Sequence, residues 1–333
     1  MRSYFDNYSI LPGLFWALVK GLKYQKRFMQ KSVIPEIEAL RKQNDGSLSE
    51  ADFQKITDYY AYAVPAILGE AFCMLRGEPM TLRERNALTF LGATTGLFDD
   101  FFDEKRTEEQ HIKALIDSPF EGLARNSHEL LFVRFFIKAL ENTDDIDELK
   151  RHCYLVFDAQ VLSKKQTNES LSKEEITQIT LQKGGVSLLF YRCVMGPYTS
   201  ENELSMVHNL GSVFQLENDL FDIYKDYLGG IRTLATTETK INNLREVYFK
   251  LMNETFSSVR QTTYESKDKK RFLQFISLIL FRGLVCLDWL EKSEQRTQGV
   301  FSIGQYSRKD LICDMEKASS VVQLLHYYGR TKF

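Results

Sequence analysis

Cysteine is scarce in this sequence of 333 residues, and its positions form no familiar pattern. The five cysteines are scattered, and none belongs to a CxxC pair: Cys73, Cys153, Cys193, Cys286 and Cys313. The pattern therefore suggests neither a disulfide framework nor a zinc site. Reduced thiols are typical of the cytosol, so we expect a cytoplasmic protein.

Proline is also rare, with six residues, and the sequence contains no Asn-Gly hairpin signal and few alternating β-branched runs. These absences argue against a sheet. Long segments instead repeat apolar residues with the period of an α-helix. The predicted helices cover 11–30, 31–43, 49–77, 81–104, 107–116, 127–141, 145–166, 172–195, 200–228, 239–265, 268–296 and 307–328.

Internal repeats and polar linkers are absent as well, so nothing in the sequence marks a domain boundary. We therefore predict one all-α domain over residues 1–333, built from about 10–13 helices around a core. The motifs described below lie within a core of about 49–296.

Neither sign of charge is in excess, because 43 Lys and Arg oppose 45 Asp and Glu for a net charge of -2. This balance gives no electrostatic argument for nucleic-acid binding. No small-residue cleavage site follows the first apolar run, and no run approaches the roughly 18 apolar residues of a membrane span. The run Phe272–Phe281 predicts a buried helix. The N-terminal stretch ILPGLFWALVKGLKYQKRF is apolar and then basic, which fits core packing or contact with a membrane surface.

Acidic residues nevertheless concentrate in the stretch LFDDFFDE (97–104), at the end of an apolar predicted helix. Helical geometry places Asp99 and Asp103 on one face and turns Asp100 and Glu104 about 100° away. Below the two aspartates on that face are the small residues Gly96, Thr95 and Gly92.

A solvated helix end would also be acidic, but carboxylates at a helix C-terminus oppose the macrodipole, and aromatic neighbours such as Phe98 indicate burial. Mg²⁺ would offset this cost, because it prefers oxygen ligands and binds one or two carboxylates together with substrate phosphates. We therefore predict metal ligands at Asp99, Asp100 and Asp103, and a cavity lined by Gly92, Thr95, Gly96 and Phe98.

A second acidic face lies in LGSVFQLENDLFDIYKDYLGG (210–230), where Asn218, Asp222 and Asp226 recur every four residues. Gly211 and Gln215 extend this face upstream, and the rest of the helix is apolar. The stripe fits a metal site or a structural polar network. The paired glycines of QKGGVS (182–187) predict an interruption in the preceding helix, where Lys183 could reach an anion. The alternative is an ordinary glycine cap between two helices.

Together these motifs resemble the class I isoprenoid synthase superfamily. DDFFDE resembles its first aspartate-rich motif, LGSVFQLENDLFDIYKD its second, and KGG lies near the family's helix break. Order and approximate spacing agree from residue 82 to residue 232. The resemblance implies an all-α barrel around a hydrophobic cavity, with both acidic motifs facing each other at its mouth. It also implies three Mg²⁺ ions that bind a prenyl diphosphate, and cavity positions at Gly184, Gly185, Gly211 and Gln215.

Three reactions of this superfamily remain open. Asn218, Asp222 and Asp226 match the terpene-cyclase pattern with Asp at the Ser/Thr and Glu places, Asp219 gives the DxxD of chain-elongating synthases, and Asp222-xxx-Asp226 resembles squalene and phytoene synthases. The sequence lacks the GGKR motif that chain-elongating synthases use, and Lys105-Arg106 follows the first acidic motif more closely than the usual Arg pair does. Head-to-head condensation is supported only faintly, by YRCVMG (191–196). We therefore favour a terpene synthase that ionises one prenyl diphosphate and then cyclises or quenches the carbocation.

The cations and aromatic residues that the resemblance suggests for diphosphate binding are Lys183, Arg192, Lys225, Arg232, Tyr306 and Arg308. We also expect that the chain forms a homodimer. Two other classes remain: a prenyl-binding relative without turnover, and a di-iron bundle. The bundle needs a Glu-x-x-His motif on each of two helices, and the sequence contains one such motif, Glu108-x-x-His111, but no second.

Overall fold

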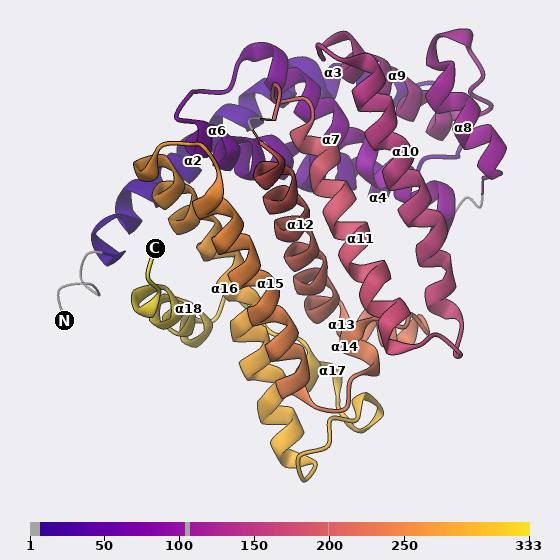
Figure 1. The fold of residues 1–333 in the computed structure, drawn as a ribbon. Coiled ribbons are helices and arrows are strands. Elements are labelled where there is room, and N and C mark those ends of the chain that lie inside the picture. Colours follow the sequence, from indigo (N-terminus) through magenta and orange to yellow (C-terminus); the bar gives the residue numbers. More distant parts are fainter. Residues whose placement is uncertain (1–6, 104–106, 199) are drawn as a thin grey trace. The chain divides into compact units, whose positions relative to one another are not determined.

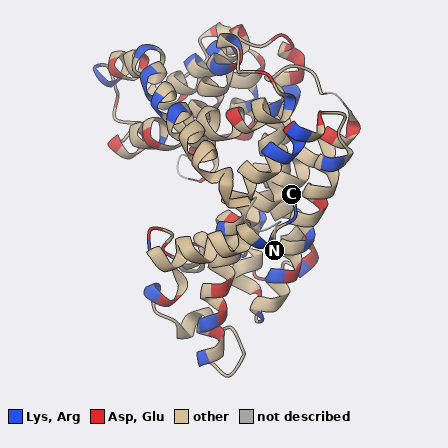
Figure 2. Ribbon diagram, turned by 90° about the vertical axis from the view of Figure 1, so that its left-hand side faces the viewer, with Lys and Arg blue, Asp and Glu red and all other residues tan. Residues whose placement is uncertain are grey.

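The computed structural model describes residues 7–103, 107–198 and 200–333, and its regular secondary structure over them is helical, with no strand (Figure 1). The prediction of an all-α fold is thus confirmed. The chain forms two compact units, which we call unit 1 (Met1–Leu11, Val161–Leu189 and Tyr198–Phe333) and unit 2 (Pro12–Gln160 and Phe190–Pro197). The prediction of a single domain over 1–333 stays a prediction. Basic and acidic residues are interspersed along the ribbon (Figure 2), as the balanced composition predicts.

Unit 2 is built around helix α7 (Leu82–Asp103), most of which is buried. Helix α9 (Ser127–Glu141) packs along it, and so do the helical turns that follow α4. The elements of this unit are α2 (Leu11–Ser32), α3 (Ile34–Arg41), α4 (Glu50–Gln54), η1 (Lys55–Tyr60), α5 (Ala61–Ala63), η2 (Val64–Gly69), α6 (Glu70–Arg76), α7, α8 (Glu109–Asp117), η3 (Pro119–Glu121), α9 and most of α10 (Ile146–Ser163).

The predicted helix over 49–77 is one helical run in which the α-helical geometry is interrupted twice. Its η1 and η2 segments are π-helical turns between short α-helical pieces. Pro65 lies at the start of η2, where its missing N–H removes one i→i−4 hydrogen bond. A wider turn is a common way to accommodate such a gap.

Unit 1 is built around helix α12 (Glu201–Phe221), which packs against α15 (Ile241–Gln261) and α16 (Ser266–Arg296). Its other elements are η4 (Lys164–Thr167), α11 (Lys173–Arg192, mostly in this unit), α13 (Ile223–Leu228), α14 (Leu234–Thr237), η5 (Ile303–Gln305), α17 (Arg308–Leu311) and α18 (Ala318–Arg330). Within the described part of the chain, α16 is the one helix long and apolar enough to cross a membrane. Since 72% of its apolar window is buried, a core helix explains it equally well.

Two predicted helices divide in the structure. The segment 200–228 ends its first helix at Phe221, and Asp222 (φ -90°, ψ 4°) turns the chain into α13. The segment 307–328 contains α17 and α18, separated by a non-helical connection.

The predicted interruption at 182–187 is wrong, because α11 runs unbroken from Lys173 to Arg192. The glycines there permit a close helix contact instead. A Cβ on Gly184 would lie 2.2 Å from the carbonyl oxygen of Gly211 on α12, and a Cβ on Gly185 would lie 2.4 Å from the ring of His208. Real Cβ atoms essentially never approach so closely. The absence of side chains therefore lets α11 and α12 meet backbone to backbone.

Candidate functional site

The acidic end of α7 holds three aspartates in different surroundings. Asp99 is half-buried and accepts a hydrogen bond from the side-chain amide of Gln160 on α10. Asp100 is only 4% exposed, and its Oδ1 lies 3.0 Å from the ammonium nitrogen of Lys55. Asp103 is exposed at the end of the helix. Glu104, Lys105 and Arg106 lie outside the described residues. The three aspartates therefore differ in burial, and Gln160 binds Asp99 while Lys55 pairs with Asp100.

The Lys55–Asp100 ion pair partly explains how a buried acidic segment is tolerated. Lys55 belongs to η1 and also lies 3.8 Å from Asp52, so it faces two carboxylates. The prediction that Asp100 is a metal ligand is at odds with this arrangement, because its charge already has a counter-ion. No local sequence pattern links Lys55 to Asp100, because 45 positions separate them.

Replacing Lys55 by methionine is expected to lower the free energy of unfolding by about 1 kcal/mol, because it leaves a buried carboxylate without its charged partner. Urea unfolding followed by circular dichroism measures the change. The double variant Lys55→Met/Asp100→Asn is expected to regain part of this loss. If the double variant, which lacks the Asp100 carboxylate, instead binds Mg²⁺ more weakly at unchanged stability, then Asp100 is a metal ligand.

The small residues on α7 pack against neighbouring segments of unit 2. A Cβ on Gly92 would lie 2.6 Å from the carbonyl oxygen of Tyr60, so Gly92 permits a close contact with η1. Gly96 lies beside Lys55 and Tyr60 at ordinary contact distance. The hydroxyl of Thr95 is 2.5 Å from that of Tyr191, whose pKa is raised by burial.

Phe98 is 5% exposed and contacts the rings of Phe101, Phe102 and Phe132. The structure packs Gly92 against η1 and Phe98 among aromatic rings, and their predicted place on a cavity wall stays a prediction. A cavity role for Thr95 and Gly96 stays a prediction.

The second acidic segment follows the bend between α12 and α13. The backbone N–H of Asp222 donates to the oxygen of Asn218 at 2.8 Å, and that of Asp226 donates to the oxygen of Asp222 at 2.9 Å. The predicted four-residue spacing therefore survives the bend. Asn218 is exposed, whereas Asp222 and Asp226 are half-buried. Asp222 also forms an ion pair of 3.6 Å with the exposed Lys225.

Asp219 is the functional candidate that the predicted ligand set omitted. It is 3% exposed and accepts hydrogen bonds from Gln215 on its own helix, at 2.9 Å, and from Thr180 on α11, at 3.2 Å. The DxxD spacing of Asp219 and Asp222 was the sequence signal for it. Gln215 thus binds Asp219. The place of Gln215 on a cavity wall stays a prediction.

Burial raises the pKa of two of these carboxyl groups, those of Asp219 and Asp226. Burial raises the pKa of Asp219 to about 6, while Gln215 and Lys183 oppose the increase. The pKa of Asp226 is raised to about 7, mainly by burial and then by the charges of Asp219 and Asp222. Lys183 and Lys225 lower that pKa, but they do not compensate fully. Burial and mutual repulsion therefore disfavour the ionised forms of Asp219 and Asp226, and a cation bound beside them would lower both pKa values.

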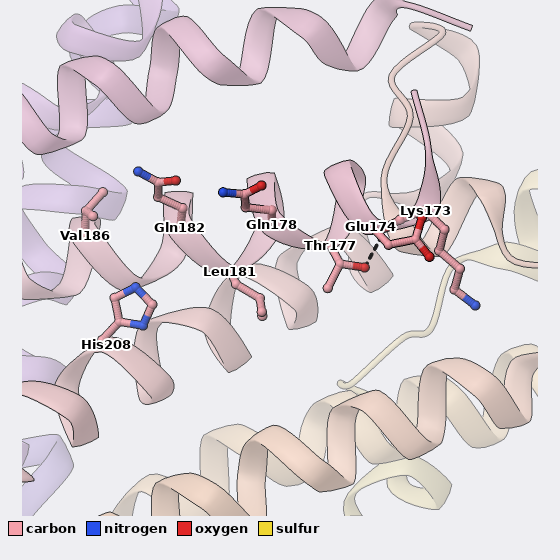
Figure 3. A pocket seen from close by; sticks show the side chains of 8 residues that line it. All are labelled: Lys173, Glu174, Thr177, Gln178, Leu181, Gln182, Val186 and His208. Carbon is pink, nitrogen blue, oxygen red and sulfur yellow. Dashed lines mark hydrogen bonds between the residues drawn. The ribbon is translucent and has the colours of Figure 1, made fainter. Parts of the chain in front are cut away.

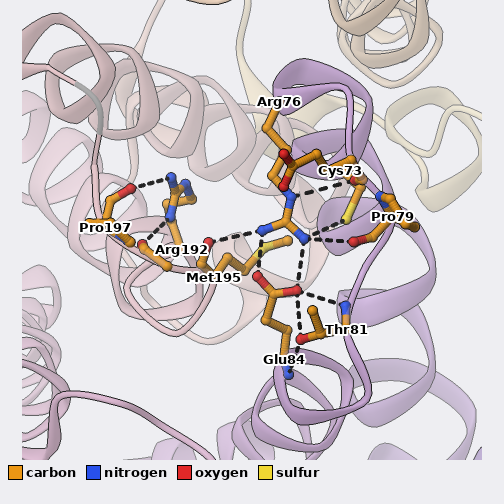
Figure 4. Close-up of polar contacts among 10 residues, drawn as sticks. Cys73, Arg76, Pro79, Thr81, Glu84, Arg192, Met195 and Pro197 are labelled. Carbon is orange, nitrogen blue, oxygen red and sulfur yellow. Dashed lines mark hydrogen bonds and ion pairs between the residues drawn. The ribbon is translucent and has the colours of Figure 1, made fainter.

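Arg192 is bound to the backbone at the end of α11. It is 3% exposed and donates to the backbone oxygens of Gly196, at 2.9 Å, and Pro197, at 3.4 Å (Figure 4). Beside it, the guanidinium of Arg76 binds Glu84 and the backbone oxygen of Met195. Arg192 thus closes the end of α11, and its role in diphosphate binding stays a prediction.

The remaining predicted diphosphate ligands are spread over unit 1. Lys183 lies close enough to Asp219 and Asp226 to lower the pKa of both. The backbone of Arg232 exchanges hydrogen bonds with Gln166. Tyr306 bonds to Thr297 and packs on Phe301. Arg308 lines a separate basic hollow of about 720 Å³, which contains neither acidic segment. Only Lys183 and Lys225 are shown beside the second acidic segment.

A second hollow, of about 650 Å³, follows one face of α11 (Figure 3). Gln178 and Gln182 project to the same side of the helix, and the ring of His208 lies below Gln182. Burial lowers the pKa of His208. The lining contains one acidic residue, Glu174, and none of the predicted ligands. This hollow is therefore distinct from the acidic segment of unit 1.

In the described part of the chain, no three His, Cys, Asp or Glu side chains are placed to hold a metal ion by themselves. Mg²⁺ does not require such a cage, because it commonly keeps waters and binds one or two carboxylates plus substrate phosphates. Asp222 and Asp226 supply two hard oxygen donors, of which Asp222 is paired with the exposed Lys225. The residues of this segment therefore fit Mg²⁺ bound together with an anionic ligand.

Comparisons with known proteins give a structural likeness and no sequence relative. No family model and no curated protein matches the sequence. A solved structure of a dehydrosqualene synthase in complex with ligand aligns with a TM-score of 0.47 and 12% sequence identity, covering 95% of this chain and 97% of that one. These comparisons do not identify a family for the chain.

Proposed function

We propose that this protein is a Mg²⁺-dependent enzyme that ionises a prenyl diphosphate and then cyclises or quenches the resulting carbocation. The observation that carries the proposal is the acidic segment of unit 1. There Asp222 and Asp226 are half-buried, the buried Asp219 lies next to them, and Lys183 and Lys225 partly oppose the negative charge of Asp226. A divalent cation bound with a diphosphate would balance that charge.

Each acidic segment is proposed to bind metal within its own unit. In unit 1, the carboxylates of Asp222 and Asp226 and the amide oxygen of Asn218 would hold Mg²⁺. In unit 2, Asp99 and Asp103 would do so. When bound, Mg²⁺ would polarise the diphosphate as a Lewis acid and stabilise it as a leaving group.

The chain's own cations would then orient the anion. Lys183 lies beside Asp219 and Asp226, and Lys225 is exposed next to Asp222, so either ammonium group could donate to a diphosphate oxygen. Lysine serves this purpose as a compact point charge. Acids that can bind a metal ion and lysines that can bind a diphosphate are both present in this segment. Their combination supports an enzyme over a prenyl-binding relative without turnover.

The proposal is tested by incubating the full chain separately with geranyl, farnesyl and geranylgeranyl diphosphate, each with Mg²⁺ or with EDTA. We expect diphosphate release in Mg²⁺ alone, and a hydrocarbon or alcohol detected by gas chromatography–mass spectrometry. A parallel set includes isopentenyl diphosphate. Release that is absent with every substrate, or equal in EDTA, contradicts the proposal.

The products also distinguish the reactions of this superfamily. A longer diphosphate formed with isopentenyl diphosphate would replace our proposal by chain elongation. A hydrocarbon or diphosphate built from two copies of one substrate would replace it by head-to-head condensation. A cyclic or linear product of unchanged carbon number supports the proposal.

A further inference from the structure

We propose that helix α2 docks this protein on membrane surfaces that contain anionic lipids. Phe15 and Trp16 would enter the interface, while a row of basic residues would contact lipid phosphates. This inference is independent of the proposed reaction, because it depends only on the surface of α2.

The first turns of α2 expose two adjacent aromatic side chains. Phe15 is 67% exposed and Trp16 is 65% exposed. Single apolar residues on a surface need no explanation, but adjacent large aromatic rings are unusual there. Tryptophan in particular favours the boundary between water and lipid, where its ring is apolar and its N–H can bind a polar group.

The same face continues as a basic surface. Its exposed cations are Lys20, Lys23, Lys26, Arg27 and Lys31, and α2 contains no acidic residue. At about 100° per residue, these side chains fall within the same half of the helix as Phe15 and Trp16. The opposite half is buried in unit 2 through Leu14, Gly21, Gln25 and Met29.

Charge selects a lipid surface as the occupant. The whole chain has a net charge of -2, whereas α2 alone carries five positive charges. Among the described residues, Asp58 shares a hollow of about 330 Å³ with Lys26, and Glu70 packs against the buried side of α2 at Gly21. Basic residues combined with interfacial aromatic rings are the pattern of peripheral membrane helices. A second copy of this basic surface would be repelled by it.

The sequence offers a direct probe, because Trp16 and Trp289 are its two tryptophans. The indole N–H of Trp289 has no hydrogen-bond partner among the described residues, so Trp289→Phe removes no such bond. In the full chain carrying this substitution, we expect the fluorescence of Trp16 to shift to the blue with vesicles of phosphatidylcholine and phosphatidylserine. With phosphatidylcholine alone we expect no shift. Vesicle flotation should show the same selectivity and should weaken at high salt.

A pair of charge-reversal variants separates the α2 surface from net charge. Lys20→Glu/Lys23→Glu is expected to reduce binding to anionic vesicles at least about 10-fold. Lys267→Glu/Lys270→Glu changes the net charge equally at exposed positions of α16 and is expected to leave binding within about 3-fold of the parent. Circular dichroism verifies that both variants are folded.

Three outcomes would overturn the inference. Binding could be absent on anionic vesicles, or it could be equal on zwitterionic vesicles at high salt. Alternatively, light scattering could show that Phe15→Ser/Trp16→Ser dissociates a dimer and does not alter vesicle binding, which would assign α2 to a contact between two copies.

Discussion

Replacing Asp226 by asparagine is expected to lower the rate of Mg²⁺-dependent diphosphate release about 100-fold or more, with the fold retained. The carboxylate is half-buried, and the charges of Asp219 and Asp222 act on it. Asparagine keeps nearly the same shape but removes the charge that would attract the cation. Loss of a ligand should cost at least as much as loss of an outer-shell partner, which typically costs 10–100-fold in metal affinity or activity.

The experiment measures diphosphate release on the accepted prenyl diphosphate over a series of Mg²⁺ concentrations, with thermal unfolding as the check on folding. Asp147→Asn is the matched control, because Asp147 is an exposed aspartate in the first turn of α10 and belongs to neither acidic segment. We expect activity in the control within about 2-fold of the parent. Full activity in the Asp226 variant would remove the metal assignment of this segment, and poor folding would leave Asp222→Asn to decide the question by the same assay.

The helices could be predicted from the sequence because apolar periodicity acts locally and needs no knowledge of partners. Helix α7 occupies Leu82–Asp103, as the pattern over 81–104 predicts within the described residues. The bend at Asp222 was missed, since its hydrogen bonds still run from each residue to the one four positions earlier. Periodicity is preserved across such a bend.

The roles of the individual acids were harder to predict, because they depend on distant residues. The pattern grouped Asp100 with Asp99, but Lys55 on η1 neutralises Asp100. It also preferred Asn218 to Asp219, yet Asp219 is the residue held by Thr180 from the neighbouring helix. Residue spacing predicts which side chains share one face of a helix. It does not predict which distant residue contacts that face.

Glycine was ambiguous for a related reason. A small residue on a buried helix predicts either open space for a ligand or the close approach of another backbone. On α7, the structure resolves this ambiguity for Gly92, which faces the backbone of Tyr60. On α11 it does so for Gly184, which faces Gly211. In both cases a neighbouring segment occupies the space, so the glycines determine how closely helices pack.

Replacing Gly184 by alanine is therefore expected to lower the free energy of unfolding by about 3 kcal/mol. The new Cβ would lie 2.2 Å from the oxygen and 2.8 Å from the carbonyl carbon of Gly211, and backbone atoms of a helix cannot rotate aside. The two helices must separate by roughly 1 Å, which also weakens the contact between Thr180 and Asp219. The better helix propensity of alanine returns only about 1 kcal/mol of a larger cost.

Gly96→Ala on α7 is the matched control, because the nearest atoms to its new Cβ lie at an ordinary 3.6 Å. This variant is expected to be as stable as the parent, or more stable by up to about 1 kcal/mol. Urea unfolding of both variants, followed by circular dichroism, gives the comparison. If Gly184→Ala unfolds at the same urea concentration as Gly96→Ala, then α11 and α12 do not meet through these glycines, and the space beside Gly184 is open to a ligand.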